Sequence, residues 1–122
     1  MTAKVLVVDD TPSIRELIAN FLRKSGYQVI EANNGKEALE KALSNVPDIV
    51  VTDVVMPEMN GFELCRSLKK NPETKNSRIV VCTSKNQDID RLWGMKQGAD
   101  IYLTKPFTEE EIMEAIQSVV VS

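Results

Sequence analysis

The stretch Val5–Asp10, VLVVDD, places two adjacent acidic residues directly after a run of four apolar residues. Three later apolar runs also end in a polar side chain that can take part in chemistry. These runs, each with the residue that follows it, are Ile49–Thr52 with Asp53, Ile79–Cys82 with Thr83, and Ile101–Thr104 with Lys105. If the four runs are parallel strands, their polar ends meet at one edge of a sheet, which is where open α/β sheets bind ligands.

The rest of the chain alternates between short runs rich in β-branched residues and longer stretches with helical periodicity. Five strands are expected, at Lys4–Asp9, Gln28–Glu31, Asp48–Asp53, Arg78–Thr83 and Ile101–Thr104. The first, third and fourth are apolar throughout rather than alternating, which is typical of parallel strands covered by helices on both faces. Because five β-α units fill residues 1–122, a single α/β domain is predicted, with no effector domain.

Five helices are expected after the strands. The first begins at Thr11-Pro12, which supplies an N-cap and a first-turn proline, and ends at Gly26. The fifth opens with Thr108–Glu111, the pattern of a capping box. Apolar residues at intervals of three and four mark the faces expected to be buried. These residues are Ile14, Leu17, Ile18, Phe21 and Leu22; Ala38, Leu39, Ala42 and Leu43; Phe62, Cys65 and Leu68; Ile89 and Leu92; and Ile112, Ala115, Ile116 and Val119.

The composition excludes several classes of protein. The chain has 122 residues, of which 43% are hydrophobic and 27% charged, as in an ordinary globular domain. No apolar stretch approaches the roughly 20 residues of a membrane span, and the N-terminus shows no signal peptide, so the expected location is the cytoplasm. The net charge is -3 and no long run of Lys or Arg is present, so binding to nucleic acid or to a membrane is not expected.

Two residue types narrow the chemistry further. The chain contains no histidine, which excludes Ser-His-Asp and Cys-His catalysis and histidine-ligated metals. It therefore cannot carry a phosphohistidine of its own. The two cysteines, Cys65 and Cys82, lie within apolar patterns and are expected to be buried, reduced thiols.

The polar groups at the strand ends are suited to binding a metal and an anion. Asp9, Asp10 and Asp53 would bring three carboxylates together, and their mutual repulsion favours a bound cation. An all-oxygen set of ligands suits Mg²⁺. Lys105 adds a positive charge for an anion and Thr83 adds a hydroxyl. A carboxylate in such surroundings can act as a nucleophile toward a phosphoryl group.

Each of these residues also has an ordinary explanation when it is taken alone. Asp9-Asp10 could simply favour the start of a helix. Asp53 could be a turn residue, Lys105 a solvated surface charge, and Thr83 a strand-end cap. Their occurrence at four strand ends, in one order along the chain, favours the chemical interpretation over these local ones.

The motifs resemble those of response-regulator receiver domains of two-component signalling, of the chemotaxis-regulator type. The resemblance covers essentially the whole chain and rests on four motifs: VLVVDD (Val5–Asp10), DIVVTDVVMPEMNGFEL (Asp48–Leu64), IVVCTS (Ile79–Ser84) and GADIYLTKPF (Gly98–Phe107). It implies a flavodoxin-like, doubly wound sheet of five parallel strands in the order 2-1-3-4-5, with five helices. It also implies phosphorelay signal transduction, with a histidine kinase or histidine phosphotransfer protein as the phosphoryl donor.

The resemblance assigns a role to each site residue. Asp53 would be the phosphoacceptor, with Mg²⁺ as the cofactor. The metal would be held by Asp10 directly and by Asp9 largely through water, together with Asp53 and the backbone carbonyl of Val55. Lys105 would pair with the phosphoryl group. The resemblance also implies that Thr83 is the switch hydroxyl, Tyr102 the aromatic that moves with it, and Lys105-Pro106 a cis peptide.

The signal is expected to leave through the fourth helix, the fifth strand and the fifth helix. Phosphorylation would draw Thr83 toward the phosphoryl group, and Tyr102 would then rotate inward in a shift between existing states. Trp93 is expected to be partly buried against the fifth helix, whereas an exposed ring would favour contact with a partner protein. The partner would be a downstream protein target, and the chain itself a monomer or weak dimer. The sequence of Arg91–Phe107 resembles that of stand-alone regulators of twitching or pilus motility.

Three other functions are compatible with parts of the pattern. The protein could be a phosphate sink for another regulator, or an interaction module that needs no phosphate. It could also be a phosphohydrolase with an aspartate nucleophile. Against the last, Asp53 is followed by Val54-Val55, so no second acid is present to protonate a leaving group. The chain is therefore not expected to be an enzyme beyond catalysing its own phosphorylation and dephosphorylation.

Overall fold

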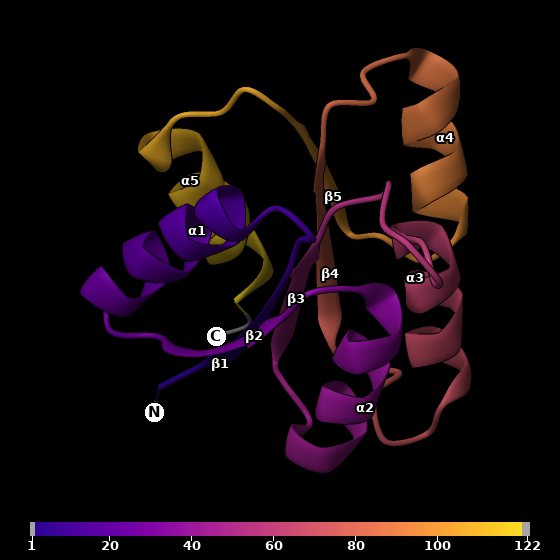
Figure 1. The fold of residues 1–122 in the computed structure, drawn as a ribbon, viewed down its shortest axis with the longest axis horizontal. Helices are drawn as coiled ribbons and strands as arrows, with labels where there is room; N and C mark the ends of the chain where they lie inside the picture. The colour runs from indigo at the N-terminus through magenta and orange to yellow at the C-terminus, as the bar shows by residue number, and fades with distance from the viewer. Residues whose placement is uncertain (1, 121–122) are drawn as a thin grey trace.

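The computed structural model describes residues 2–120, which form one five-stranded parallel sheet in the order β2-β1-β3-β4-β5, flanked by helices (Figure 1). The predicted fold class and strand order are confirmed. In chain order the elements are β1 (Lys4–Val8), α1 (Pro12–Lys24), β2 (Gln28–Ala32), α2 (Gly35–Asn45), β3 (Ile49–Thr52), α3 (Gly61–Lys70), β4 (Arg78–Thr83), α4 (Asp88–Lys96), β5 (Ile101–Thr104) and α5 (Glu109–Val119).

The two faces of the sheet are covered by different helices. Successive side chains of a strand point to opposite faces, so Val5 and Val7 pack in the cluster that contains Ile18 of α1 and Ile116 of α5. The side chains of β1 that point to the opposite face, such as Leu6, pack in the other cluster with side chains of α2 and α3. Figure 1 shows α1 and α5 on one side of the sheet and α2, α3 and α4 on the other. Burial on both faces explains why the central strands are continuously apolar.

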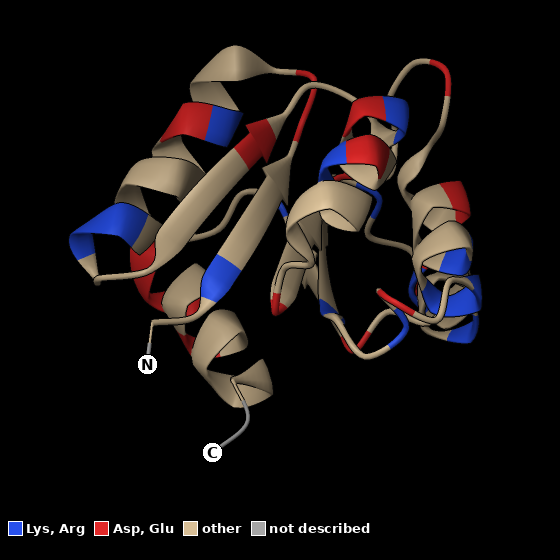
Figure 2. Cartoon of the chain, turned by 90° about the horizontal axis from the view of Figure 1, so that it is seen from below, with Lys and Arg blue, Asp and Glu red and all other residues tan. Residues whose placement is uncertain are grey.

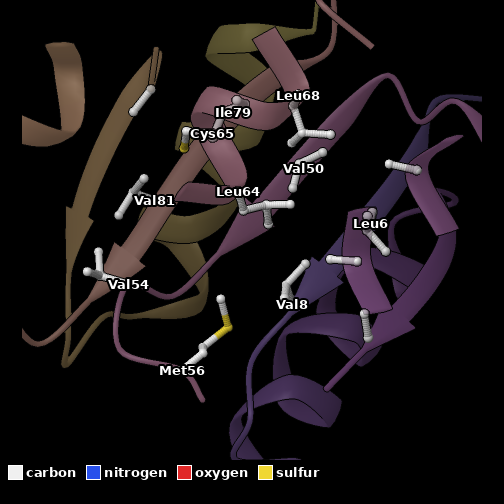
Figure 3. Packing of buried hydrophobic residues seen from close by; sticks show 14 of the residues in the cluster. Leu6, Val8, Val50, Val54, Met56, Leu64, Cys65, Leu68, Ile79 and Val81 are labelled. Carbon is white, nitrogen blue, oxygen red and sulfur yellow. The ribbon is translucent and has the colours of Figure 1, made fainter. Parts of the chain in front are cut away.

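The core beneath α3 is built from leucines and branched residues of three adjacent strands. Leu64 and Leu68 project from α3 toward Val50 of β3 and Ile79 of β4 (Figure 3). These four side chains are fully buried. In Figure 2 the strands carry few charged residues, whereas the helices carry most of them. The sheet is thus the apolar frame on which the polar strand ends are mounted.

The helix ends follow their local sequence signals, with one exception. The predicted capping box of α5 is confirmed, because the Thr108 hydroxyl accepts from the Glu111 N–H at 3.1 Å and the Glu111 carboxylate accepts from the Thr108 N–H at 2.9 Å. Thr11 occupies the N-cap of α1, as predicted, but its side chain makes no capping hydrogen bond. Gly26 follows that helix with φ of 94°, a conformation that favours glycine.

The predicted buried face of α1 is confirmed except at Leu17, since Ile14 and Phe21 also pack against the core. Leu17 is 44% exposed, whereas Ile18, Ala19 and Leu22 are buried. Successive residues are about 100° apart around a helix, so a helix that buries Ala19 must turn Leu17 outward. Leu43 of α2 is likewise exposed, which corrects its predicted inward position. The predicted faces of α3 and α5 are confirmed for Cys65, Leu68 and the four apolar residues of α5.

The largest correction concerns α4. Ile89 and Leu92, predicted to face inward, are 63% and 54% exposed, and only Gly94 of this helix is buried. Gly94 lies against the Tyr102 ring so closely that an added Cβ would be 2.9 Å from the ring carbon Cδ2. Contact through the glycine turns the opposite, apolar side of the helix outward. Trp93, expected to be partly buried against the fifth helix, is 48% exposed as a whole residue.

Within residues 2–120, none of the helices has the length and apolar character that crossing a membrane requires.

Substituting two leucines of α1 would test which of them faces the core. Leu22→Ala removes a fully buried side chain and is expected to lower the free energy of unfolding by about 2–5 kcal/mol. Leu17→Ala, in the same helix, should lower it by less than about 1 kcal/mol because this residue is already 44% exposed to water. Urea denaturation of both variants measures the difference. Equal losses would contradict the orientation of α1 described here.

Candidate functional site

The polar residues singled out from the sequence meet at the carboxyl edge of the sheet. Val8 of β1 pairs with Thr52 of β3, so Asp9 and Asp53 follow neighbouring strands at the same level. On the other side of β3, Thr83 of β4 pairs with Thr104 of β5, which places Lys105 one residue beyond that pair. The parallel register alone therefore brings acids, hydroxyl and lysine to one edge.

Three carboxylates form the centre of the site. One carboxylate oxygen from each of Asp9, Asp10 and Asp53 lies within 4.8 Å of the other two. Asp9 is 1% exposed, Asp53 is partly buried, and Asp10 is exposed to solvent. Oxygen donors at this spacing fit a hard cation such as Mg²⁺, which keeps several of its water ligands. Asp10 offers the side from which a hydrated ion could approach.

Lys105 neutralises part of this negative charge. Its ammonium group donates to the Asp9 carboxylate at 2.8 Å and to the Asp53 carboxylate at 3.1 Å. Burial by itself lowers the pKa of Lys105, but the hydrogen bond to Asp9 and the attraction of Asp53 outweigh it, and the pKa is raised. The charge is thus present at neutral pH, and its contribution to stability is lost only as pH rises through that raised pKa. The Lys105-Pro106 bond is cis, as predicted.

The loop that follows β3 fixes the Asp53 carboxylate. One oxygen of this carboxylate accepts from the Val54 N–H at 2.6 Å, and the Asp53 N–H donates to the carbonyl of Val8 at 3.1 Å. Gly61 begins α3 directly against this loop, because a Cβ there would overlap the carbonyl oxygen of Asp53. Val55, expected to offer its backbone carbonyl to a metal, lies in this loop with its side chain 60% exposed. The sequence marks Gly61 only as a helix start and does not reveal this close approach.

Thr83 and Tyr102 are joined through one peptide segment. Thr83 is fully buried, and its hydroxyl accepts from the Lys85 N–H at 3.3 Å. The Tyr102 hydroxyl donates to the carbonyl of the same Lys85 at 2.9 Å. Tyr102 is 5% exposed, so its side chain already lies in the inward position that was expected only after phosphorylation. Burial, chiefly, raises the pKa of its hydroxyl.

Arg91 is a residue that sequence reasoning missed. Its guanidinium lies 5.2 Å from the centre of the Tyr102 ring and donates to the Tyr102 carbonyl at 2.8 Å. Stacking of this kind stabilises the pair through the quadrupole of the ring. Together with Gly94 on the same helix, Arg91 holds the tyrosine under α4. No spacing rule in the sequence identifies this contact, because the partner lies on another element.

A cavity of about 400 Å³ lies elsewhere, where the strands begin rather than end. It is lined by residues that include Pro47, Asp48, Ser77, Arg78 and Val119. None of the carboxylates of the acidic site lines it, so it is separate from that site.

A family model described as a response regulator receiver domain matches residues 5–117. This chain belongs to that family. Receiver domains are signalling domains that accept phosphoryl groups from histidine kinases in two-component phosphorelays, and they bind Mg²⁺ at an acidic cluster of the kind found here.

The receiver domain is similar over almost its full length to stand-alone proteins. It is 41% identical to protein PilH of Pseudomonas aeruginosa over 117 residues, which cover 96% of this chain and 97% of PilH. It is 38% identical to protein PilG of the same organism, over 94% of this chain and 85% of PilG. The structure of the Vibrio cholerae chemotaxis protein CheY4 matches 98% of this chain and 100% of its own with a TM-score of 0.93 and 36% identity.

The two cysteines of the receiver domain should be chemically inert in the folded protein. Both are buried, as predicted, and burial raises the pKa of the Cys65 thiol and of the Cys82 thiol to about 12. At pH 8 only about one thiol in ten thousand would be ionised, and the thiolate is the reactive form. We expect a disulfide reagent to modify neither cysteine in native protein and both in urea. Rapid modification of Cys82 without denaturant would contradict this arrangement.

Proposed function

We propose that the Asp53 carboxylate accepts a phosphoryl group from a phosphohistidine of a histidine kinase or histidine phosphotransfer protein. An oxygen of Asp53 forms a bond to phosphorus while the bond from phosphorus to the imidazole nitrogen breaks. The electron pair of that bond stays on the imidazole, which takes up a proton. The observation that supports this is the grouping of three carboxylates within 4.8 Å, with Lys105 bonded to two of them.

Each residue of the site has a defined task in this proposal. Asp9, Asp10, Asp53 and the carbonyl of Val55 would hold Mg²⁺, which supplies positive charge for the phosphoryl oxygens when it is bound. Lys105 places a second positive charge beside the same oxygens. It also orients the Asp53 oxygen that it contacts. The bond from the Val54 N–H orients the other Asp53 oxygen. Catalysis then consists of positioning and charge neutralisation, and it acts on this chain alone.

The change at Asp53 would reach the surface through Thr83, Lys85 and Tyr102. A phosphoryl oxygen offers Thr83 a stronger acceptor than any neutral group nearby, and movement of its hydroxyl releases the Lys85 N–H. Because Tyr102 is bonded to the same residue, the loop before α4 and the α4–β5–α5 face would shift together. The apolar residues exposed on α4 offer a surface for a downstream protein target, and they are Ile89, Leu92, Trp93 and Met95.

We further propose a stand-alone role in taxis or motility, in the cytoplasm, as a monomer or weak dimer that does not bind nucleic acid. The match to nearly the full length of PilH, PilG and the chemotaxis protein CheY4 supports this role. In this proposal residues 1–122 act as a single receiver domain.

Intact-mass measurement with a small phosphodonor would test the acceptor. Wild-type protein incubated with acetyl phosphate and Mg²⁺ should gain the mass of one phosphoryl group, and the gain should be lost without Mg²⁺. Asp53→Asn removes the nucleophile and should gain nothing. Thr83→Ala is the matched control, because it changes the site but keeps the nucleophile and should still be modified. An unmodified wild type, under conditions that phosphorylate another receiver domain, would refute the proposal.

Trp93 offers an internal probe of the proposed switch. It is the one tryptophan of the chain and is half exposed on α4, so a shift of α4 should change its fluorescence. We expect acetyl phosphate with Mg²⁺ to change the emission of wild type but not of Thr83→Ala, although both take up phosphate by mass. The same change in both proteins would show that the signal reaches α4 without Thr83.

A further inference from the structure

Arg15 is a charged residue on the buried side of α1. Its side chain is only 13% exposed, and it precedes the buried Ala19 and Leu22 by four and seven residues, so the three share one face of the helix. The apolar pattern of α1 does not predict this position. A guanidinium with so little access to water needs partners for its N–H groups, and the partners of Arg15 lead to the acidic site.

The guanidinium of Arg15 contacts three groups. One nitrogen, Nη1, donates to the carbonyl oxygen of Asp9 at 2.9 Å and to the side chain of Asn33 at 2.7 Å. The Nε–H donates to the Glu31 carboxylate at 3.1 Å. Glu31 and Asn33 lie in and just after β2, so Arg15 links α1, β2 and the loop that carries the acids.

The contact to Asp9 fixes a peptide plane rather than a side chain. The carbonyl oxygen of Asp9 belongs to the planar peptide that joins Asp9 to Asp10. The Asp9 side chain is held independently, by the Thr11 N–H at 2.9 Å and by Lys105 at 2.8 Å. The bond from Arg15 therefore fixes the orientation of this peptide plane, and with it the direction in which the chain continues to Asp10.

We infer that Arg15, held on Glu31, is a positioning residue that orients the Asp9–Asp10 peptide and so aims the Asp10 carboxylate at a divalent cation. The inference rests on the proposed function, because it assumes that the three acids bind Mg²⁺. Asp10 is the exposed member of the group, so its position has the least support from packing. Arg15 supplies that support from behind the loop.

Glu31 has a second task in this arrangement. A bare guanidinium beside a cation site would repel the ion, and Glu31 balances that charge. Its other oxygen accepts from Arg23 at 3.1 Å. Arg23 lies on the same helix and shares the same acid, but Asp9 is not among its hydrogen-bond partners in the described part of the chain. The chain thus contains a matched control for Arg15.

Calorimetric titration of unphosphorylated protein with Mg²⁺ would test the inference, with urea denaturation as a check on folding. Arg15→Ala should weaken Mg²⁺ binding roughly tenfold, the range known for residues that orient metal ligands. Arg15→Lys keeps the charge but loses the planar fork that reaches several acceptors, and it should also weaken binding. Arg23→Ala should change the dissociation constant by less than about twofold, because Glu31 remains paired with Arg15.

A second readout separates positioning from general damage to the fold. If Arg15 acts through metal affinity, the rate of phosphorylation of Arg15→Ala by acetyl phosphate should approach that of wild type at saturating Mg²⁺. If Arg15→Ala does not fold, Arg15→Lys decides the matter by the same two measurements.

Three results would overturn the inference. They are unchanged Mg²⁺ affinity in a folded Arg15 variant, an equal loss in Arg23→Ala, and a rate that stays low at saturating Mg²⁺. Failure of the proposed function looks different, because wild type itself would then neither bind Mg²⁺ nor take up phosphate.

Discussion

Three carboxylates at the ends of two neighbouring strands repel one another, and much of the structure around them limits that repulsion. Lys105 reaches across from the end of β5 to bond Asp9 and Asp53. The Thr11 N–H and the Val54 N–H each donate to one carboxylate oxygen. The folded protein thus keeps uncompensated negative charge on the exposed side of the site, where Asp10 lies. Such a group of oxygen donors favours a hard cation such as Mg²⁺.

The grouping of these residues could be predicted because it depends on strand ends alone. Parallel strands in register bring their carboxyl ends to one edge, so Asp9, Asp53 and Lys105 converge once the strands are recognised. The apolar runs are short and bounded, and they predict the strands to within a residue or two. Identifying the order of the strands required the family resemblance, since periodicity does not reveal which strands are neighbours.

Other features could not be predicted, because they depend on contacts between elements distant in sequence. The outward apolar face of α4 follows from Gly94 lying against Tyr102, and helical periodicity marks an apolar face without saying whether the protein or a partner covers it. The exposure of Leu17 follows from the burial of Ala19 on the same face as Ile18 and Leu22. The burial of Arg15 could not be predicted from the sequence, because a charged residue in a helix is ordinarily solvated.

The packing of α4 also bears on how easily this helix can move. Among its residues only Gly94 is buried, and a glycine contributes no side chain to the core. The large apolar residues of α4 are already about half exposed, at 44–63%, so displacing this helix exposes less additional apolar surface than displacing a helix with buried side chains would. Regions with few buried contacts open at a small fraction of the free energy of global unfolding. The receiver domain therefore combines a rigid sheet with one weakly packed helix. A shift of that helix leaves the central core unchanged.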